Sequence, residues 1–449
     1  MTPADARDRS TASGLTWRAA SWVFCVLAAN FAARSVRDAI AVQSDDETTR
    51  RLFIGTLIAT LLLNPPLAFF LARANRRLTI TLLYRFFSGT LVATYVAMLV
   101  TGGERVEWIG WFYYIALSVF NVAMVSLFWA FMADVSSLVD SKQRYGRIAM
   151  GATLGAIAGG SLASGVSWLA KAGQIPAAVG GALVLIPIAA LLIEIAVQIM
   201  RTLDRRVPPR DAHGRVVEQR IKASWYDGFL ATIRSIYLSG LSLYLVCLAM
   251  ISTLMYFTKI RIVREASEGL DESAFWLANI DIAQNVAVLL VQAFATGWLL
   301  RRLGVSLALA VLPLTALAGF AALALQPAYT VYVVFEAVFK AVKYAVQRPA
   351  RETLFTVVSR EEKYAAKALL DTFVYRGGDV FGTAVQANAE RMAASAAFTA
   401  TSAMLTLAAP ITLVAGTVGV WLGYRQRVLA ARTAGPADPA PDSDRSDHS

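Results

Sequence analysis

The chain of 449 residues is 57% hydrophobic and 16% charged, and its mean hydropathy is +0.54, which excludes an ordinary soluble domain. The formal net charge is +11, which would suit a nucleic-acid partner. However, the basic residues lie mainly in alternate polar segments, as they do in a membrane topology signal. We therefore expect a lipid bilayer as a partner and no nucleic acid.

Residue types that carry covalent or metal chemistry are few and scattered. Cys25 and Cys247 lie in separate apolar segments, while His213 lies in a polar segment and His448 in the C-terminal tail. This distribution gives no disulfide framework, metal cluster or histidine-based catalytic group. The sequence also lacks a Walker-type phosphate-binding loop. We expect no cofactor and no enzyme activity.

Apolar windows of roughly 20 residues, the length that spans a bilayer as a helix, follow one another along the chain. A spanning segment must satisfy its backbone hydrogen bonds internally, so we predict an all-α polytopic membrane protein with about twelve transmembrane helices and no barrel. The predicted spans are residues 16–42, 52–72, 78–100, 108–133, 148–169, 175–200, 225–257, 274–300, 305–325, 330–346, 366–387 and 397–424.

The longest polar interruption divides these spans into two sets of six. We predict a cytoplasmic tail (1–15), a first bundle (16–200), a cytoplasmic linker (201–224), a second bundle (225–424) and a disordered cytoplasmic tail (425–449). Basic segments follow every second span, so we expect both termini to face the cytoplasm. Lys259, Arg261 and Arg264 are exceptions, because they lie on the side where the other loops are acidic or mixed.

The two sets echo each other. The stretch QRYGRIAMGATLGAIAGG in the first set is matched loosely by EKYAAKALLDTFVYRGG in the second, with Gly159 and Gly160 opposite Gly377 and Gly378. Repeated six-helix halves resemble the plan of major facilitator transporters, whose substrate site lies at the midplane between the halves. Gly151, Gly155 and Gly159 form small-xxx-small steps, which we interpret as close helix packing rather than a phosphate cradle.

Charged residues inside apolar spans are expensive and face a cavity or a partner. Lysine and arginine in such a cavity would bind a polyanion, so we predict a small anionic substrate. The predicted substrate-binding residues are Arg34, Arg37, Lys340, Lys343, Tyr375 and Arg376. The predicted coupling or gating residues are Asp38, Asp281, Asn285, Glu336, Asp371 and Asp379. The alternative is an internal ion-pair network in which Arg34 or Arg37 pairs with Asp38, and Lys340 with Glu336.

Several short motifs, in order along the chain, resemble the ATP/ADP translocases of plastids and intracellular parasites. They are RSVRD at residues 34–38, SLFWAFMAD at 126–134, ESAFWLANID at 272–281, PARE at 349–352 and KALLD at 367–371. The resemblance implies a major-facilitator-like fold and exchange of nucleotides. It also implies that Arg37 stands for the family's first-span substrate lysine. Two positions depart from the family pattern: Leu117 replaces an acidic residue, and Asp379 stands near a lysine position.

We therefore predict a monomeric secondary transporter of the bacterial inner membrane that uses alternating access to exchange nucleotides or a related phosphorylated anion. One alternative is a proton-coupled exporter of another small organic solute. An alternative from a different class is a membrane receptor or scaffold that transports nothing.

Overall fold

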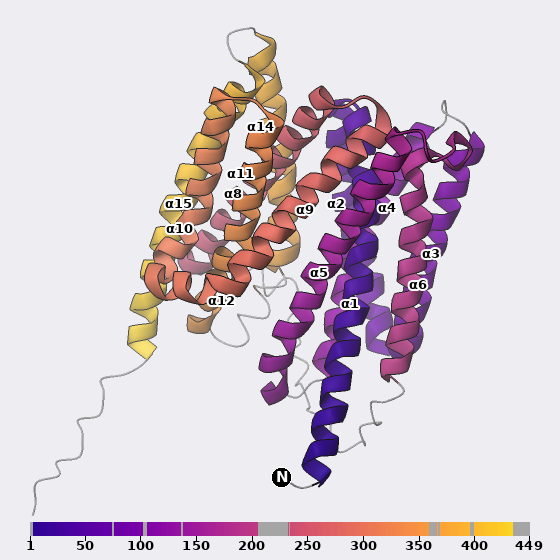
Figure 1. Cartoon of the computed structure of the whole chain (residues 1–449). Coiled ribbons are helices and arrows are strands. Elements are labelled where there is room, and N and C mark those ends of the chain that lie inside the picture. The colour runs from indigo at the N-terminus through magenta and orange to yellow at the C-terminus, as the bar shows by residue number, and fades with distance from the viewer. Residues whose placement is uncertain are drawn as a thin grey trace, which may run out of the picture.

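In the computed structural model, long helices run side by side between two ends of the molecule (Figure 1). The structure describes residues 3–73, 76–101, 106–135, 138–204, 232, 234–358, 366, 369–395 and 399–433. Within these ranges there are no strands, and nine helices are long and apolar enough to cross a membrane. These features confirm the all-α polytopic membrane architecture.

The first half of the chain comprises six long helices and two short 3-10 turns. They are α1 (Pro3–Gln43), α2 (Asp46–Arg73), α3 (Arg76–Thr101), α4 (Val106–Val135), α5 (Leu138–Lys171), η2 (Ala177–Val179), η3 (Gly181–Val184) and α6 (Leu185–Asp204). We call the end where α1 meets α2 the α1–α2 end, and the end where α6 finishes the linker end.

The second half repeats this up-and-down course with more interruptions. Its elements are α8 (Ile236–Ala266), α9 (Gly269–Phe294), α10 (Thr296–Leu325), α11 (Tyr329–Val342), η4 (Lys343–Gln347), α12 (Arg348–Thr353), η5 (Leu354–Val357), η6 (Leu370–Val374), α14 (Tyr375–Ala394) and α15 (Ala400–Thr433). Gly304 has a φ of 62° and marks a kink within α10. The π-helical turns η4 and η6 interrupt the two helices that carry most of the predicted site.

Several boundaries differ from the sequence prediction. Helix α1 begins at Pro3, so helix runs through most of the segment predicted as a tail, and α15 continues to Thr433 rather than ending at residue 424. Helix α8 reaches Ala266 instead of ending at residue 257. Most of residues 258–263 are buried, and the three basic side chains of this segment, Lys259, Arg261 and Arg264, have acidic partners. Most of the predicted linker and the last sixteen residues lie outside the described residues, so the domain division stays a prediction.

Glycines set the closest helix contact in the first half. A Cβ added at Gly151, Gly155 or Gly159 of α5 would meet the backbone of α1 at Ala20, Phe24 and Ala28 in turn. The regular step brings the two backbones together over several turns. The interpretation of these glycines as packing residues is confirmed.

The equivalent helices of the second half use the same device. A Cβ at Gly378 of α14 would meet the backbone of α8 at Val246, and a Cβ at Gly382 would meet Met250 and Thr253. A close helix contact therefore recurs in both halves, α5 on α1 through Gly159 and α14 on α8 through Gly378.

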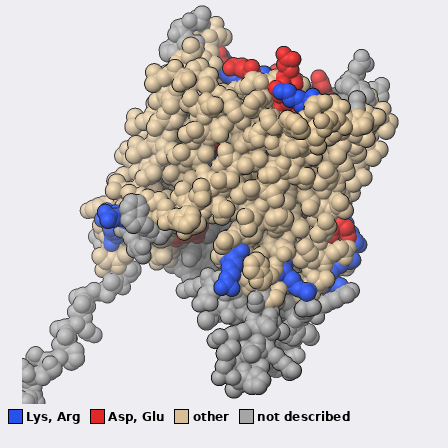
Figure 2. Space-filling model, viewed as in Figure 1, with Lys and Arg blue, Asp and Glu red and all other residues tan. Residues whose placement is uncertain are grey.

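The two halves are tied together at the α1–α2 end, where charged side chains gather in Figure 2. The Arg264 guanidinium on α8 donates to the carbonyls of Val42 (2.8 Å) and Ser44 (2.6 Å) and to Asp46 Oδ1 (2.8 Å). It thereby satisfies orphan carbonyls at the C-terminal end of α1. Arg50 of α2 pairs in turn with Glu390 of α14 at 2.6 Å. This end of the structure is closed by contacts between the halves.

Candidate functional site: a charged cavity between the halves

A buried carboxylate, Asp38 of α1, lies at the centre of the charged group and is 1% exposed. Arg37 donates to its Oδ1 from Nε at 2.9 Å and from Nη2 at 2.5 Å. Across the interface, Lys259 of α8 donates to Oδ2 at 2.7 Å and the Tyr256 hydroxyl donates to Oδ1 at 3.2 Å. Arg34 approaches Oδ2 at 3.5 Å. One carboxylate thus links three cations from both halves.

Arg34 extends the group to α9, because its Nη1 lies 3.7 Å from Asp281 Oδ1. Gln284 also donates to that oxygen, at 2.5 Å. Asn285 instead donates to the backbone carbonyl of Asp281, at 2.7 Å, so its amide nitrogen is engaged on its own helix. The predicted coupling residues Asp38 and Asp281 are therefore brought together through Arg34.

On α11, Lys340 lies 3.8 Å from Glu336 Oε1. Glu336 is 4% exposed, and its Oε2 has no hydrogen-bond partner within the described part of the chain. Pairing of Lys340 with Glu336, and of Arg34 and Arg37 with Asp38, is what the ion-pair alternative anticipated from the sequence.

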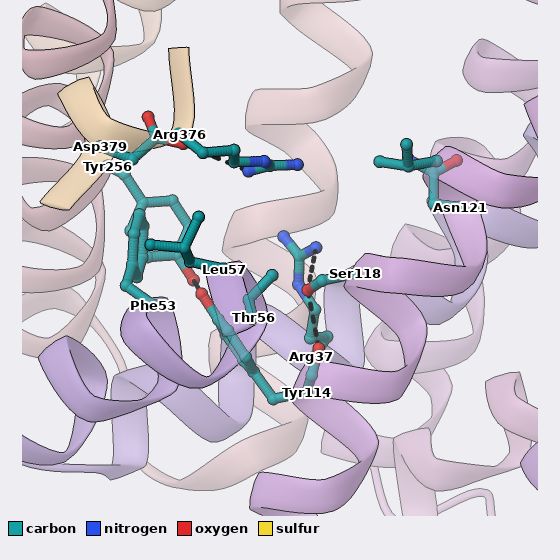
Figure 3. Close-up of a pocket in the computed structure, with 11 residues that line it drawn as sticks. Arg37, Phe53, Thr56, Leu57, Tyr114, Ser118, Asn121, Tyr256, Arg376 and Asp379 are labelled. Atoms are coloured by element: carbon teal, nitrogen blue, oxygen red, sulfur yellow. Dashed lines mark hydrogen bonds and ion pairs between the residues drawn. The ribbon is translucent and has the colours of Figure 1, made fainter. Parts of the chain in front are cut away.

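A cavity of about 210 Å³ lies beside this group, between α1, α2 and α4 of the first half and α8 and α14 of the second. Arg37 and Arg376 point into it from different halves, as Figure 3 shows. Arg37 also donates from Nη1 to Ser118 at 3.3 Å and lies 5.2 Å from the centre of the Tyr114 ring. Asn121, whose Oδ1 has no hydrogen-bond partner in the described residues, lies across the cavity. The cavity wall is therefore cationic and rich in hydrogen-bonding groups.

Arg376 is held by one acidic neighbour on its own helix. Its Nη1 lies 3.2 Å from Asp379 Oδ2, while Thr253 of α8 donates to Asp379 Oδ1 at 3.3 Å. The role of Asp379 is thus to hold the Arg376 guanidinium in position.

A second polar contact joins the two π-helical turns. Lys343, the first residue of η4, donates to the Tyr375 hydroxyl at 3.1 Å and to Ser252 Oγ at 3.1 Å. Tyr375 is the first residue after η6. π-Helical turns are frequent at functional sites, where they redirect side chains.

The predicted residues thus fall into separate places. Arg37, Arg376 and Asp379 line the cavity, whereas Arg34 and Asp281 lie in the ion-pair network behind it. The Lys340–Glu336 and Lys343–Tyr375 pairs are not part of the cavity lining. Asp371 falls within η6, but its side chain lies outside the described part of the structure.

Sequence reasoning missed Lys259, Tyr256, Tyr114, Ser118 and Asn121. The predicted seventh span ends at residue 257, which places Lys259 in a loop. The apolar residues Ile260, Ile262 and Val263 that follow it indicate that the helix continues, and α8 buries Lys259 to 2% exposure.

The charge balance of the site favours an anion. Around the cavity and the adjoining ion-pair network, the basic side chains outnumber the acidic ones by one among those that the structure describes. The basic set is Arg34, Arg37, Lys259 and Arg376, and the acidic set is Asp38, Asp281 and Asp379. A net positive charge in a low-dielectric cavity attracts phosphate or carboxylate groups.

Comparison with known proteins gives both a family and a fold. A family model described as TLC ATP/ADP transporter matches residues 99–428. No curated protein matches the chain closely enough to serve as a relative.

Solved transporter structures share the fold at low sequence identity. A bacterial homologue of the iron transporter ferroportin, in an inward-facing state, is 13% identical with a TM-score of 0.63, covering 91% of this chain and 98% of that one. The nucleoside transporter NupG is 13% identical with a TM-score of 0.57, covering 93% and 99%. A bacterial homologue of the human lysosomal transporter Spinster is 15% identical with a TM-score of 0.58, covering 94% and 96%. The major-facilitator-like fold predicted from the sequence is confirmed.

Proposed function

Because the chain belongs to the TLC ATP/ADP transporter family and is therefore a transporter rather than an enzyme, we propose that it exchanges nucleotides or related phosphorylated anions across a bacterial inner membrane. In this proposal both termini are cytoplasmic, and the α1–α2 end faces outward. The protein works as a monomer, since each chain has both halves of the site.

The observation that carries the proposal is the pair of arginines that face one cavity from different halves. Arg37 comes from α1 and Arg376 from α14. A guanidinium presents a fork of donors that matches the oxygens of a phosphate, so two of them bind a polyphosphate at two points. A ligand held by both halves is coupled to their relative movement, which is what alternating access requires.

The size of the cavity supports binding of one end of a nucleotide in this conformation. Its volume is about 210 Å³, whereas pockets that enclose a whole drug-sized ligand have roughly 300–1,000 Å³. The phosphates would lie between Arg37 and Arg376, and the base and sugar would extend out of the cavity.

The two departures from the family pattern favour keeping related phosphorylated anions in the proposal. Leu117 is buried at 2% exposure, so a hydrophobic side chain fills the position where the family has an acid. Asp379 adds a negative charge near the position where the family has a lysine, but Arg376, which pairs with it, supplies a positive charge to the cavity. One change removes a negative charge and the other adds one, while Arg37 and Arg376 still supply positive charge to the cavity wall.

Counterflow in proteoliposomes tests the proposal. Vesicles loaded with unlabelled ADP or ATP are given labelled nucleotide outside, and Arg37→Gln and Arg376→Gln are compared with Arg85→Gln. Arg85 pairs with Glu194 at 2.7 Å on the surface of the first half, away from the cavity.

We expect uptake that needs internal nucleotide, that is lost in the two cavity variants and that survives in the control. Equal uptake in all three variants would refute the role of the cavity. A folded wild-type protein without uptake would refute nucleotide exchange, and uptake driven by a proton gradient alone would favour the proton-coupled alternative.

A further inference from the structure

We propose that the Lys259–Asp38 pair locks the empty carrier at the α1–α2 end, so that Lys259 is a positioning residue for exchange. Lys259 lies on α8 and Asp38 on α1, and their charged atoms are 2.7 Å apart. The link to exchange rests on the proposed function, but the lock itself can be tested in protein without any nucleotide.

Lys259 depends on this one carboxylate. Both side chains of the pair are 2% exposed, and among the described residues Asp38 is the acidic side chain within ion-pair distance of Lys259. The other close group is the ring of Tyr256, whose centre lies 4.8 Å from Nζ. A buried ammonium that loses its anion keeps the cost of its desolvation without compensation, so breaking a buried ion pair is strongly unfavourable. The desolvation cost of the unpaired ammonium therefore strongly disfavours separation of Lys259 from Asp38.

Asp38 does not depend on Lys259 in the same way. It also accepts from Arg37 at 2.9 Å and from the Tyr256 hydroxyl at 3.2 Å, and Arg34 lies 3.5 Å away. Arg37 and Arg34 are on the same helix as Asp38, so they stay with it when the halves move. When α1 and α8 separate, Asp38 therefore keeps two basic partners, whereas Lys259 loses its acidic partner.

The pair lies on the helices that must separate for the α1–α2 end to open. Helix α8 carries Arg264, whose guanidinium binds the carbonyls of Val42 and Ser44 at the end of α1. Lys259 precedes Arg264 on the same helix, nearer the cavity. Movement of α8 away from α1 would break both contacts. The Lys259–Asp38 contact is the more deeply buried one, and it lies next to residues that line the cavity.

A phosphate in the cavity would weaken the lock electrostatically. Arg37 and Tyr256 both line the cavity, and each contacts Asp38 directly. A phosphate held by Arg376 as well as Arg37 stays in contact with the second half when the halves move, and it places negative charge on the side of Lys259 in a medium of low dielectric constant. That charge replaces part of the stabilisation that the ammonium loses when it leaves Asp38. The loaded carrier would therefore open at this end, whereas the empty one would stay closed, which is the condition for obligatory exchange.

The test measures opening directly, using spin labels at Arg51→Cys and Asn388→Cys. These positions are exposed, belong to α2 and α14, and lie near the Arg50–Glu390 contact between the halves. The native cysteines, both buried, are replaced by serine. Distances between the labels are recorded without nucleotide for this background, for Lys259→Gln and Lys259→Met, and for an Arg85→Gln/Glu194→Gln control. The control removes an ion pair within one half.

We expect the background and the control to have one short distance. Both Lys259 variants should add a longer distance whose population rises at least about tenfold, since removal of the ammonium leaves Asp38 paired with Arg37 and Arg34. Two substitutions are used because each leaves a different side chain in the buried site, and only monodisperse protein is measured. Distance distributions of both variants that match the background would overturn the lock.

Flux then tests the coupling to exchange. Loaded vesicles with the Lys259 variants should release nucleotide into medium without nucleotide, while the wild type retains it. Retention in the variants, alongside normal wild-type counterflow, would overturn the coupling to exchange. Failure of wild-type counterflow would instead count against the proposed substrate, and the label distances would still decide the lock.

Discussion

Replacement of Arg264 by methionine should open the α1–α2 end, because one guanidinium carries several contacts between the halves. The side chain donates to the carbonyls of Val42 and Ser44 at 2.8 and 2.6 Å and to Asp46 at 2.8 Å. All three acceptors belong to the first half, whereas Arg264 belongs to the second. Val42 is 1% exposed, so little water can reach it as a replacement partner while this end stays closed.

The size of the effect can be worked out from these contacts. Each hydrogen bond to a backbone carbonyl contributes about 1 kcal/mol. The ion pair with Asp46 contributes about 0.5 kcal/mol, because the Arg264 side chain is 34% exposed and solvent screens the pair. The total of about 2.5 kcal/mol corresponds to a roughly 50- to 100-fold shift of the equilibrium between closed and open forms.

The assay is the distance between spin labels at positions 51 and 388, compared with Arg85→Gln as an arginine control outside the interface. Arg264→Lys provides a second comparison, since a lysine keeps the charge but not the fork of donors, and we expect an intermediate shift. An unchanged distance distribution in Arg264→Met would refute the reasoning, because it would mean that these contacts do not hold the halves together.

Two further predictions concern packing and the second polar contact. Gly155→Ala should destabilise the protein by about 1–3 kcal/mol, measured by unfolding in detergent, because the added Cβ would meet the backbone of α1. Gly165→Ala on the same helix should be neutral or stabilising, since nothing lies within 4 Å of its added Cβ, and equal destabilisation of both variants would contradict the close packing. Tyr375→Phe should lower counterflow about fivefold by removing the acceptor for Lys343, and Phe373→Leu, at an exposed apolar position, serves as its control. Unchanged counterflow in Tyr375→Phe would exclude this contact from the transport cycle.

The helices and the close pairs within them were accessible from the sequence for simple physical reasons. Long apolar windows leave the backbone no alternative to helix in a bilayer. Pairs such as Arg34–Asp38 and Glu336–Lys340 are four residues apart, so helical geometry alone brings them together. The regular spacing of the α5 glycines likewise predicted a close helix contact.

The contacts between the halves could not be read in this way. Lys259 and Arg264 resemble charges of a loop, and their partners Asp38 and Asp46 lie in the other half of the chain. Only the tertiary arrangement shows that a lysine on α8 completes a group on α1. The π-helical turn at Lys343 could not be predicted either, because no local pattern in the sequence distinguishes it from regular helix.

The central claim is that arginines from both halves bind one phosphorylated anion, and equilibrium binding of labelled ATP to the purified protein tests it most directly. We predict that Arg37→Gln and Arg376→Gln each raise Kd at least about tenfold, as expected for loss of a charged hydrogen bond, while Arg85→Gln leaves Kd unchanged. Binding that is unaffected by either cavity variant would contradict the claim, because the anion would then be held by one half or elsewhere.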